Sequence, residues 1–432
     1  MIRVLLHEIR RGEAGKVAAL CAVIGVWSLA SADPATSDWI GWWTQTSVEV
    51  QVFGVIVMGS LMSAAAAWTA GRDGRTRAHA WADTTPRGGW PRTLLLAGAA
   101  WLCALAVYAL LTAVAFARTA EVSEVTAPVW TPLLLAAAMT GLQIAAGVAA
   151  GSLLPSRITA PAMGVLWYLA FVVFAFVPAS PVAALFPAID EHWDAAFLPN
   201  TARLLTATAW CAAAALVLLA LPALVRRAVL RPGPALAVPA AVALVAGGAL
   251  LTFRAPEPDP FWAVRTPQPA APVCATSGRT EACLWPADRH LLPAARAAVT
   301  TVDRALGSLD GFHREFRQTG LRLDGPGTAE LPVYRPVVDT RTMTGAMLDA
   351  ALPQPPSGCS PHLLKVTGGY PDTFLLQAVL LARADFPGPY YGEQFAAALE
   401  GVLKAPAAAR DQWLSAAARE IGACRPVPPP PR

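Results

Sequence analysis

Residues 131–154 read TPLLLAAAMTGLQIAAGVAAGSLL, an apolar stretch without Asp, Glu, Lys or Arg. The hydrocarbon core of a bilayer is about 30 Å thick, and an α-helix needs about 20 apolar residues to cross it. Similar charge-free stretches lie on both sides of this one. The sequence therefore predicts an all-α polytopic membrane protein with about seven transmembrane helices. These are expected near residues 17–32, 52–70, 94–117, 131–154, 160–179, 204–225 and 234–253.

The composition also indicates a membrane protein. The chain has 432 residues, of which 55% are hydrophobic and 14% are charged, whereas about 25% of the residues in soluble domains are charged. Charged residues reach an ordinary density only after residue 254, so a water-facing domain is expected there. The predicted organisation is a basic amphipathic segment (1–16), a six-helix membrane domain (17–225), a seventh transmembrane helix (226–253), a Pro-rich linker (254–272), a mainly helical soluble domain (273–425) and a disordered tail (426–432).

Basic residues in the connecting segments predict the orientation, because cytoplasmic loops carry an excess of Lys and Arg. With the N-terminus inside, the outer loops before residue 254 hold only Arg118 and Arg203. The sequence thus predicts a multi-pass plasma-membrane protein with a cytoplasmic N-terminus and an extracytoplasmic C-terminal domain. The basic residues placed inside are Arg3, Arg10, Arg11, Lys16, Arg72, Arg75, Arg77, Arg87, Arg92, Arg157, Arg226, Arg227 and Arg231.

The first and last spans each leave an alternative open. A basic flank, a short apolar run and the small residues at 30–32 are also typical of a cleaved signal peptide. Glu8 and Glu13 in the flank favour an uncleaved helix. Pro234 and Pro239 lie near the start of the last span. If that segment did not cross, the final domain would be cytoplasmic.

Cysteine usage favours an oxidising compartment for the final domain. Cys274, Cys283, Cys359 and Cys424 all lie there, and four cysteines outside the cytoplasm suggest two disulfides. Three pairings are possible, and the favoured one joins Cys274 to Cys283 and Cys359 to Cys424. The alternative is four free thiols in a reducing compartment. The other cysteines lie within the spans, where they behave as small apolar residues: Cys21, Cys103 and Cys211.

The final domain shows helical periodicity in most of its length. Apolar residues at i, i+3 and i+4 predict helices near 291–306, 374–384, 391–403 and 406–422. A short strand is expected near Val333–Val338.

No catalytic, metal or cofactor site is predicted, and the protein is not expected to be an enzyme. Residues 12–16 resemble the end of a phosphate-binding loop, but they lack its spacing and its preceding strand. Nucleic-acid binding would need a basic patch on one face, and none is visible. Ion-coupled carriers usually keep ionisable residues at membrane depth, whereas the clearest polar residue within these spans is Gln143. A transporter of this kind would need an ATPase on another polypeptide.

The membrane half resembles the permease subunits of type-2 ABC exporters, on features that lie within residues 1–225. An amphipathic segment precedes the first span, and the loop after the second span is charged and ends in a Thr-Pro turn. The family's coupling helix, which docks on the ATPase, occupies that position. The resemblance assigns this role to Arg72, Asp73, Arg75, Arg77, Asp83, Thr85, Pro86 and Arg87. A short loop at 155–157 and an apolar, Pro-marked loop from residue 184 are further likenesses.

The resemblance implies a permease that works as a homo- or heterodimer in the lipid bilayer with a cytoplasmic ABC ATPase. Family members usually have six spans, whereas a seventh span and an outer domain are expected here, as in some actinobacterial permease-like proteins. The alternative hypothesis is a non-transporting membrane sensor, immunity factor or scaffold that binds a partner through its outer domain. An intramembrane enzyme is disfavoured, because no set of a nucleophile with a base and no metal-ligand set is visible.

Overall fold

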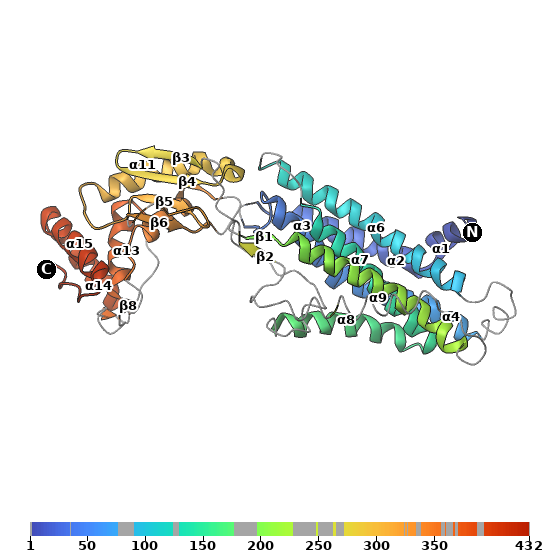
Figure 1. Cartoon of the computed structure of the whole chain (residues 1–432). Coiled ribbons are helices and arrows are strands. Elements are labelled where there is room, and N and C mark those ends of the chain that lie inside the picture. Colours follow the sequence, from blue (N-terminus) through green and yellow to red (C-terminus); the bar gives the residue numbers. More distant parts are fainter. Residues whose placement is uncertain are drawn as a thin grey trace. The chain divides into compact units, whose positions relative to one another are not determined.

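The computed structural model describes residues 2–34, 36–76, 90–123, 129–176, 197–227, 248, 262–264, 272–323, 325, 327–333, 338–355, 359, 366–367, 370–386 and 393–431 (Figure 1). The chain divides into two compact units, which we treat separately. The N-terminal unit comprises Met1–His192 and Leu198–Ala263, and the C-terminal unit comprises Trp193–Phe197 and Val264–Arg432.

The N-terminal unit is built from helices. They are α1 (Ile2–Arg11), α2 (Glu13–Ser31), α3 (Trp43–Val52), the π-helical segment η1 (Phe53–Gly59), α4 (Ser60–Arg75), α6 (Trp90–Ala120), α7 (Thr131–Leu153), α8 (Thr159–Phe176) and α9 (Thr201–Arg227). The short strands β1 (Phe197–Pro199) and β2 (Trp262–Val264) pair with each other.

Five described helical stretches are long and apolar enough to cross a membrane. They are Glu13–Ser31, Trp43–Arg72, Arg92–Ala120, Thr131–Leu153 and Thr201–Pro222. The expected span at 160–179 corresponds to α8, whose apolar part, Thr159–Phe174, is shorter. The expected seventh span at 234–253 lies outside the described residues apart from Gly248.

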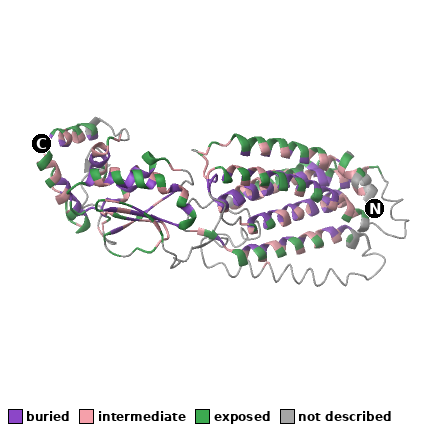
Figure 2. Ribbon diagram, turned by 90° about the horizontal axis from the view of Figure 1, so that it is seen from above, coloured by how far each residue is buried: buried purple, intermediate pink, exposed green. Residues whose placement is uncertain are grey.

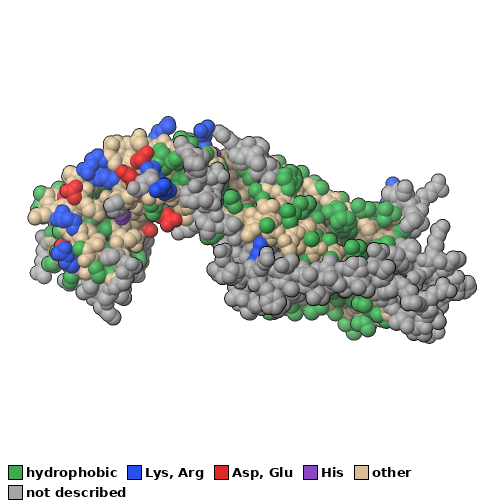
Figure 3. All heavy atoms as spheres, viewed as in Figure 1, with side chains coloured by type: hydrophobic (Ala, Val, Ile, Leu, Met, Phe, Trp, Pro, Cys, Tyr) green, Lys and Arg blue, Asp and Glu red, His purple; other side chains and the backbone are tan. Residues whose placement is uncertain are grey.

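The surface of these helices is apolar, as a lipid-facing surface must be. On α2, Val23 is 69% exposed and Trp27 is 72% exposed, and Leu166 on α8 is 60% exposed. Hydrophobic side chains cover much of the helical surface that is visible in Figure 3. Among the described large apolar residues of the C-terminal unit, only Leu323 (49%) and Phe374 (38%) are exposed, and both are less exposed than these. Soluble proteins rarely expose large contiguous apolar patches, so the N-terminal unit has the surface of a membrane protein.

Helix α7 forms the core of the N-terminal unit and packs mainly against α4 and α9. Most of its residues are buried, and Figure 2 shows buried residues along the helices of this unit. Gly147 and Gly151 let the backbone of α4 come close. A Cβ added to either glycine would lie 2.2 Å from a carbonyl oxygen, that of Ser63 or that of Ala67 respectively. Small residues spaced by four let helices approach in this way within membranes.

The second span begins earlier than expected. A start near residue 52 was predicted, but the helix begins at Trp43. Its first turns are polar, and Thr46, Ser47 and Gln51 are nonetheless fully buried. Glu49 lies half-buried among them. The predicted span 52–70 lies within this helix, and the turns before it were not predicted because a hydropathy criterion rejects polar residues even where they face other helices.

The C-terminal unit combines a small sheet with helices. Its elements are β3 (Val273–Ser277), β4 (Thr280–Leu284), the 3₁₀ turn η3 (Pro286–Leu291), α11 (Leu292–Leu306), β5 (Glu315–Gln318), β6 (Thr328–Leu331), α12 (Thr340–Ala350), β7 (Val366–Thr367), β8 (Tyr370–Pro371), α13 (Asp372–Arg383), α14 (Glu393–Lys404) and α15 (Ala407–Gly422).

A four-stranded sheet with the order β3-β4-β5-β6 corrects the all-α prediction. Strands β3 and β4 form an antiparallel hairpin, and β4, β5 and β6 run parallel to one another. Ala275, Ala282 and Phe316 lie on one face, are buried, and belong to adjacent strands. Helix α11 packs against β3 and β4.

Four of the predicted helices of the outer domain are present as α11, α13, α14 and α15. The strand expected near Val333–Val338 falls mostly outside the described residues, because residues 334–337 are not among them; the described strand before it, β6, ends at Leu331. Helix α12 and the four-residue to five-residue strands were missed, because such short segments carry little periodicity.

Candidate functional site

The π-helical segment η1 and the end of α3 that precedes it pack against α6 and α7, and two side chains bind the backbone of this stretch, one in α3 and one in η1. Tyr108 on α6 donates its hydroxyl hydrogen bond to the carbonyl oxygen of Val50 (2.9 Å). Gln143 on α7 donates from Nε2 to the carbonyl oxygen of Val55, also at 2.9 Å. Both side chains are buried. A π-helical turn displaces backbone carbonyls from the regular α-helical pattern, and here neighbouring helices supply donors near it.

Glycines of this segment make room for both side chains. A Cβ at Gly54 would lie 2.1 Å from the ring of Tyr108, and a Cβ at Gly59 would lie 1.7 Å from Oε1 of Gln143. The same arrangement thus occurs twice, five residues apart. In each case a carbonyl (Val50 or Val55) accepts a hydrogen bond from a side chain, and the glycine four residues later (Gly54 or Gly59) leaves room for that side chain. The sequence analysis identified Gln143 but missed Tyr108 and the glycines.

Further polar groups are buried around this segment. The hydroxyl groups of Thr46 on α3 and Thr119 on α6 lie 2.6 Å apart. Oε1 of Gln143 and the hydroxyl groups of Ser60 and Ser63 on α4 are buried without a hydrogen-bond partner among the described residues. Buried polar groups normally have partners. This interior can therefore offer hydrogen bonds to water or to a polar group that enters between the helices.

The beginning of the predicted coupling segment lies at the end of α4. Arg72, Asp73 and Arg75 belong to its last turns. The guanidinium of Arg75 stacks over Trp68, 4.5 Å from the ring centroid, and its Nη2 donates to the carbonyl oxygen of Trp68. The remaining residues of the segment lie outside the described part of the chain: Arg77, Asp83, Thr85, Pro86 and Arg87.

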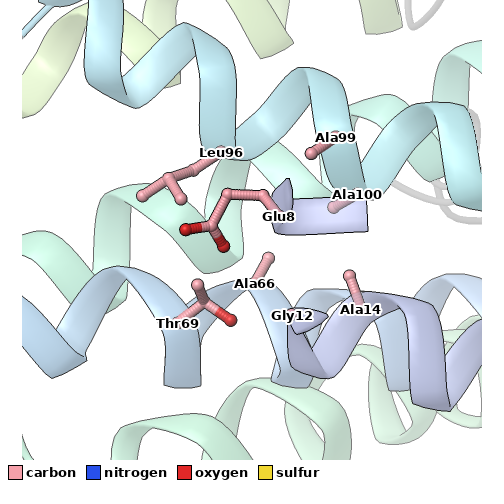
Figure 4. Close-up of a pocket in the computed structure, with 8 residues that line it drawn as sticks. All are labelled: Glu8, Gly12, Ala14, Ala66, Thr69, Leu96, Ala99 and Ala100. Atoms are coloured by element: carbon pink, nitrogen blue, oxygen red, sulfur yellow. The ribbon is translucent and has the colours of Figure 1, made fainter. Parts of the chain in front are cut away.

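The N-terminal helix contacts this end of α4 through an ion pair. Nη2 of Arg72 lies 3.7 Å from Oε1 of Glu8 on α1. In Figure 4 the Glu8 carboxylate points between α4 and α6, into a pocket that also includes Gly12, Ala14, Ala66, Thr69, Leu96, Ala99 and Ala100. Its volume of about 10 Å³ suffices for about one water molecule. The carboxylate therefore sits at a packed helix junction rather than in a substrate-sized cavity.

Both favoured cysteine pairings are present in the C-terminal unit. The sulfurs of Cys274 and Cys283 lie 1.98 Å apart, and those of Cys359 and Cys424 lie 2.07 Å apart. Among the described residues, the one group with metal-binding spacing is Cys274, Cys283 and Glu281. Its two sulfurs are joined in a disulfide, so they cannot act as thiolate ligands. The three remaining cysteines, Cys21, Cys103 and Cys211, are free and buried.

No protein-family model matches the chain, and neither a curated protein nor a solved structure shows significant similarity to it.

Proposed function

We propose that this chain is the membrane permease subunit of an ATP-driven ABC exporter in the plasma membrane. A separate cytoplasmic ABC ATPase would supply the energy, and two permease subunits, identical or different, would pair to form the pathway. An amphipathic or peptide-like substrate suits a helical interior that is mainly apolar with a few buried hydrogen-bonding groups. The N-terminus would be cytoplasmic and the C-terminal unit extracytoplasmic.

The observation that carries this proposal is the continuous helical run from Trp43 to Arg75. At one end it holds the buried polar residues and the π-helical segment. At the other it ends in the basic residues that begin segment 72–87. A helix moves as a stiff element along its axis, whereas a π-helical turn is a place where its hydrogen bonding can change. If an ATPase displaced segment 72–87, the helical run would thus transmit this movement to the buried polar residues at its other end.

The ion pair between Glu8 and Arg72 supports the same proposal, because it ties α1 to the end of this run. In the orientation proposed, α1 would lie at the cytoplasmic membrane surface next to the docked ATPase. Movement of segment 72–87 would then be shared by α1 and α4 instead of being absorbed by a loop.

The C-terminal unit favours a second candidate function. It is a separately packed unit with its own sheet and two disulfides, and an extracytoplasmic domain of this kind suits the binding of a peptide or an envelope partner. In this alternative the chain is a non-transporting sensor, immunity factor or scaffold, and segment 72–87 has no ATPase partner.

Purification from the native host distinguishes the two functions. The tagged full-length protein would be extracted in mild detergent, and the co-purifying chains and ATP hydrolysis would be measured. The permease proposal predicts a stoichiometric ABC ATPase that is lost when residues 72–87 are replaced by a neutral linker. The matched control for charge is a variant in which residues 72–87 are present in scrambled order. This variant should also lose the ATPase if docking depends on the shape of the segment. Intact protein without an ATPase, in detergent and in nanodiscs, would contradict the permease function.

A further inference from the structure

Three adjacent strands of the C-terminal sheet align a disulfide with a cation. Cys274 on β3 is directly opposite Cys283 on β4, and Cys283 is opposite Arg317 on β5. Directly opposed residues point to the same face of a sheet. The disulfide and the guanidinium therefore share one face, and Ala275, Ala282 and Phe316 occupy the other.

The guanidinium of Arg317 contacts both sulfurs. Its Nη1 donates to Sγ of Cys283, and it lies 3.8 Å from Sγ of Cys274. The two cysteines differ in burial, since residue Cys274 is partly exposed whereas Cys283 is completely buried. An external thiol can thus reach one sulfur, while the other lies beneath a positive charge.

Acidic groups on the same face oppose that charge. Nη2 of Arg317 lies 3.4 Å from Oε2 of Glu281, and the Glu281 carboxylate is within 4.8 Å of both sulfurs. Glu315 and Glu330 occupy the neighbouring positions on β5 and β6. The site therefore contains one cation that favours a thiolate and a close carboxylate that disfavours it.

We propose that the Cys274–Cys283 disulfide is an exchangeable redox site for an external thiol, and that Arg317 stabilises the thiolate released from Cys283. The Cys359–Cys424 disulfide is then a structural crosslink, because it joins residues 65 positions apart in the sequence. The chemical class of the partner is a dithiol, such as a dithiol-containing reductant protein or a small dithiol.

The exchange balances as follows. A thiolate of the partner attacks Sγ of Cys274, a new sulfur–sulfur bond forms, and the Cys274–Cys283 bond breaks. The electron pair of that bond stays on Sγ of Cys283 as a thiolate. The second thiolate of the partner then attacks the partner's first sulfur, which is bonded to Cys274 in the mixed disulfide, and the Cys274 thiolate is released. The partner is oxidised to a disulfide, the two cysteines are reduced, and both thiolates take up protons from water.

Electrostatics predicts the direction of two substitutions. A neighbouring cation lowers the pKa of an acid by about 1–3 units, and a leaving thiol of lower pKa departs faster. If the rate follows the leaving-group pKa with a slope of about 0.5, Arg317→Gln should slow exchange by roughly three- to thirtyfold. Glu281→Gln removes the opposing carboxylate and should accelerate exchange. A purely structural role for these residues would predict faster exchange in both variants, because both would loosen the sheet.

The experiment uses the full-length protein in detergent with dithiothreitol as the dithiol. Exchange is quenched with a maleimide at set times, and labelling of each cysteine is measured by mass spectrometry. We expect Cys274–Cys283 to open at least about tenfold faster than the internal control Cys359–Cys424, with Arg317→Gln slower and Glu281→Gln faster than the unmodified protein. Equal rates for the two disulfides would overturn the proposal, as would a shift of both variants in the same direction or no shift in either.

Single-cysteine variants test which sulfur is attacked. With oxidised glutathione as the probe, Cys283→Ser leaves Cys274 free and should form a mixed disulfide rapidly. Cys274→Ser leaves only the buried Cys283 and should react slowly. Faster reaction of Cys283 than of Cys274 would contradict the assigned order of attack.

Discussion

The substitution Gly59→Ala tests the packing at the π-helical segment. The added methyl group would lie 1.7 Å from Oε1 of Gln143, so the amide must swing away and give up its hydrogen bond to Val55. Hydrogen bonds between membrane helices contribute about 0.6 kcal/mol on average and up to about 1.7 kcal/mol. Repacking a filled interior adds about 1–3 kcal/mol. We therefore expect Gly59→Ala to lower the free energy of unfolding by about 2 kcal/mol.

The assay is unfolding of the full-length protein by SDS in mixed micelles, followed by tryptophan fluorescence. Gly98→Ala on α6 is the matched control, because nothing lies within 4 Å of its added Cβ, and we expect no loss of stability there and a gain of up to about 1 kcal/mol from the helix propensity of alanine. Removing the amide with Gln143→Ala should make room for the methyl group, so the double variant should be less destabilised than the sum of the single variants by about 1 kcal/mol. A Gly59→Ala variant no less stable than the Gly98→Ala variant, or strict additivity, would refute this reasoning.

Three further predictions concern other parts of the chain. Gly151→Val places a branched side chain against a carbonyl of α4 and should prevent accumulation of monodisperse protein, as measured by size-exclusion chromatography; normal yield would contradict it. Replacing both Cys359 and Cys424 with Ser opens a crosslink that spans 65 residues, and we expect a loss of about 4 kcal/mol, seen as faster proteolysis of the C-terminal unit. Asp339 caps α12 by accepting a hydrogen bond from the backbone N–H of Thr342 (2.6 Å), and this bond holds the pKa of the carboxyl below its ordinary value. Asp339→Ala should therefore lower the free energy of unfolding by about 1 kcal/mol at neutral pH. A lowered pKa stabilises the fold only while the carboxyl is ionised, so the stability difference between the two proteins should vanish as the pH falls through the folded-state pKa, below about 3.9. A stability difference that persists in acid would contradict the capping role.

Length and hydropathy predicted most of the membrane helices, because a lipid-facing helix must be apolar over its whole length. They failed where a helix turns polar residues toward its neighbours. Thr46, Gln51 and Glu49 belong to the helix of the second span, but because they are polar, hydropathy did not assign them to it. The π-helical segment was likewise invisible, since its sequence FGVIVMG is that of an ordinary apolar helix.

In the C-terminal unit the longer helices were predicted from their 3.6-residue periodicity, whereas the sheet was not. Strand β4 has only five residues, of which Ala282 and Cys283 are buried on opposite faces, so no alternation of apolar and polar residues marks it. Of the three cysteine pairings that the sequence left open, the favoured one is present. The partnership of Arg317 with Cys283 could not be predicted, because it depends on the register between two parallel strands that are distant in the sequence.

The proposed topology, which the permease function requires, is tested most directly by the side of the membrane on which each part of the chain lies. Thr76→Cys and Ser308→Cys introduce thiols at exposed positions, the first within segment 72–87 and the second in the C-terminal unit. The native background should be silent, because three cysteines are buried and four are in disulfides. With a membrane-impermeant maleimide on intact cells, the account predicts labelling of Ser308→Cys, and labelling of Thr76→Cys only after permeabilisation. Labelling of both positions from the same side would contradict it.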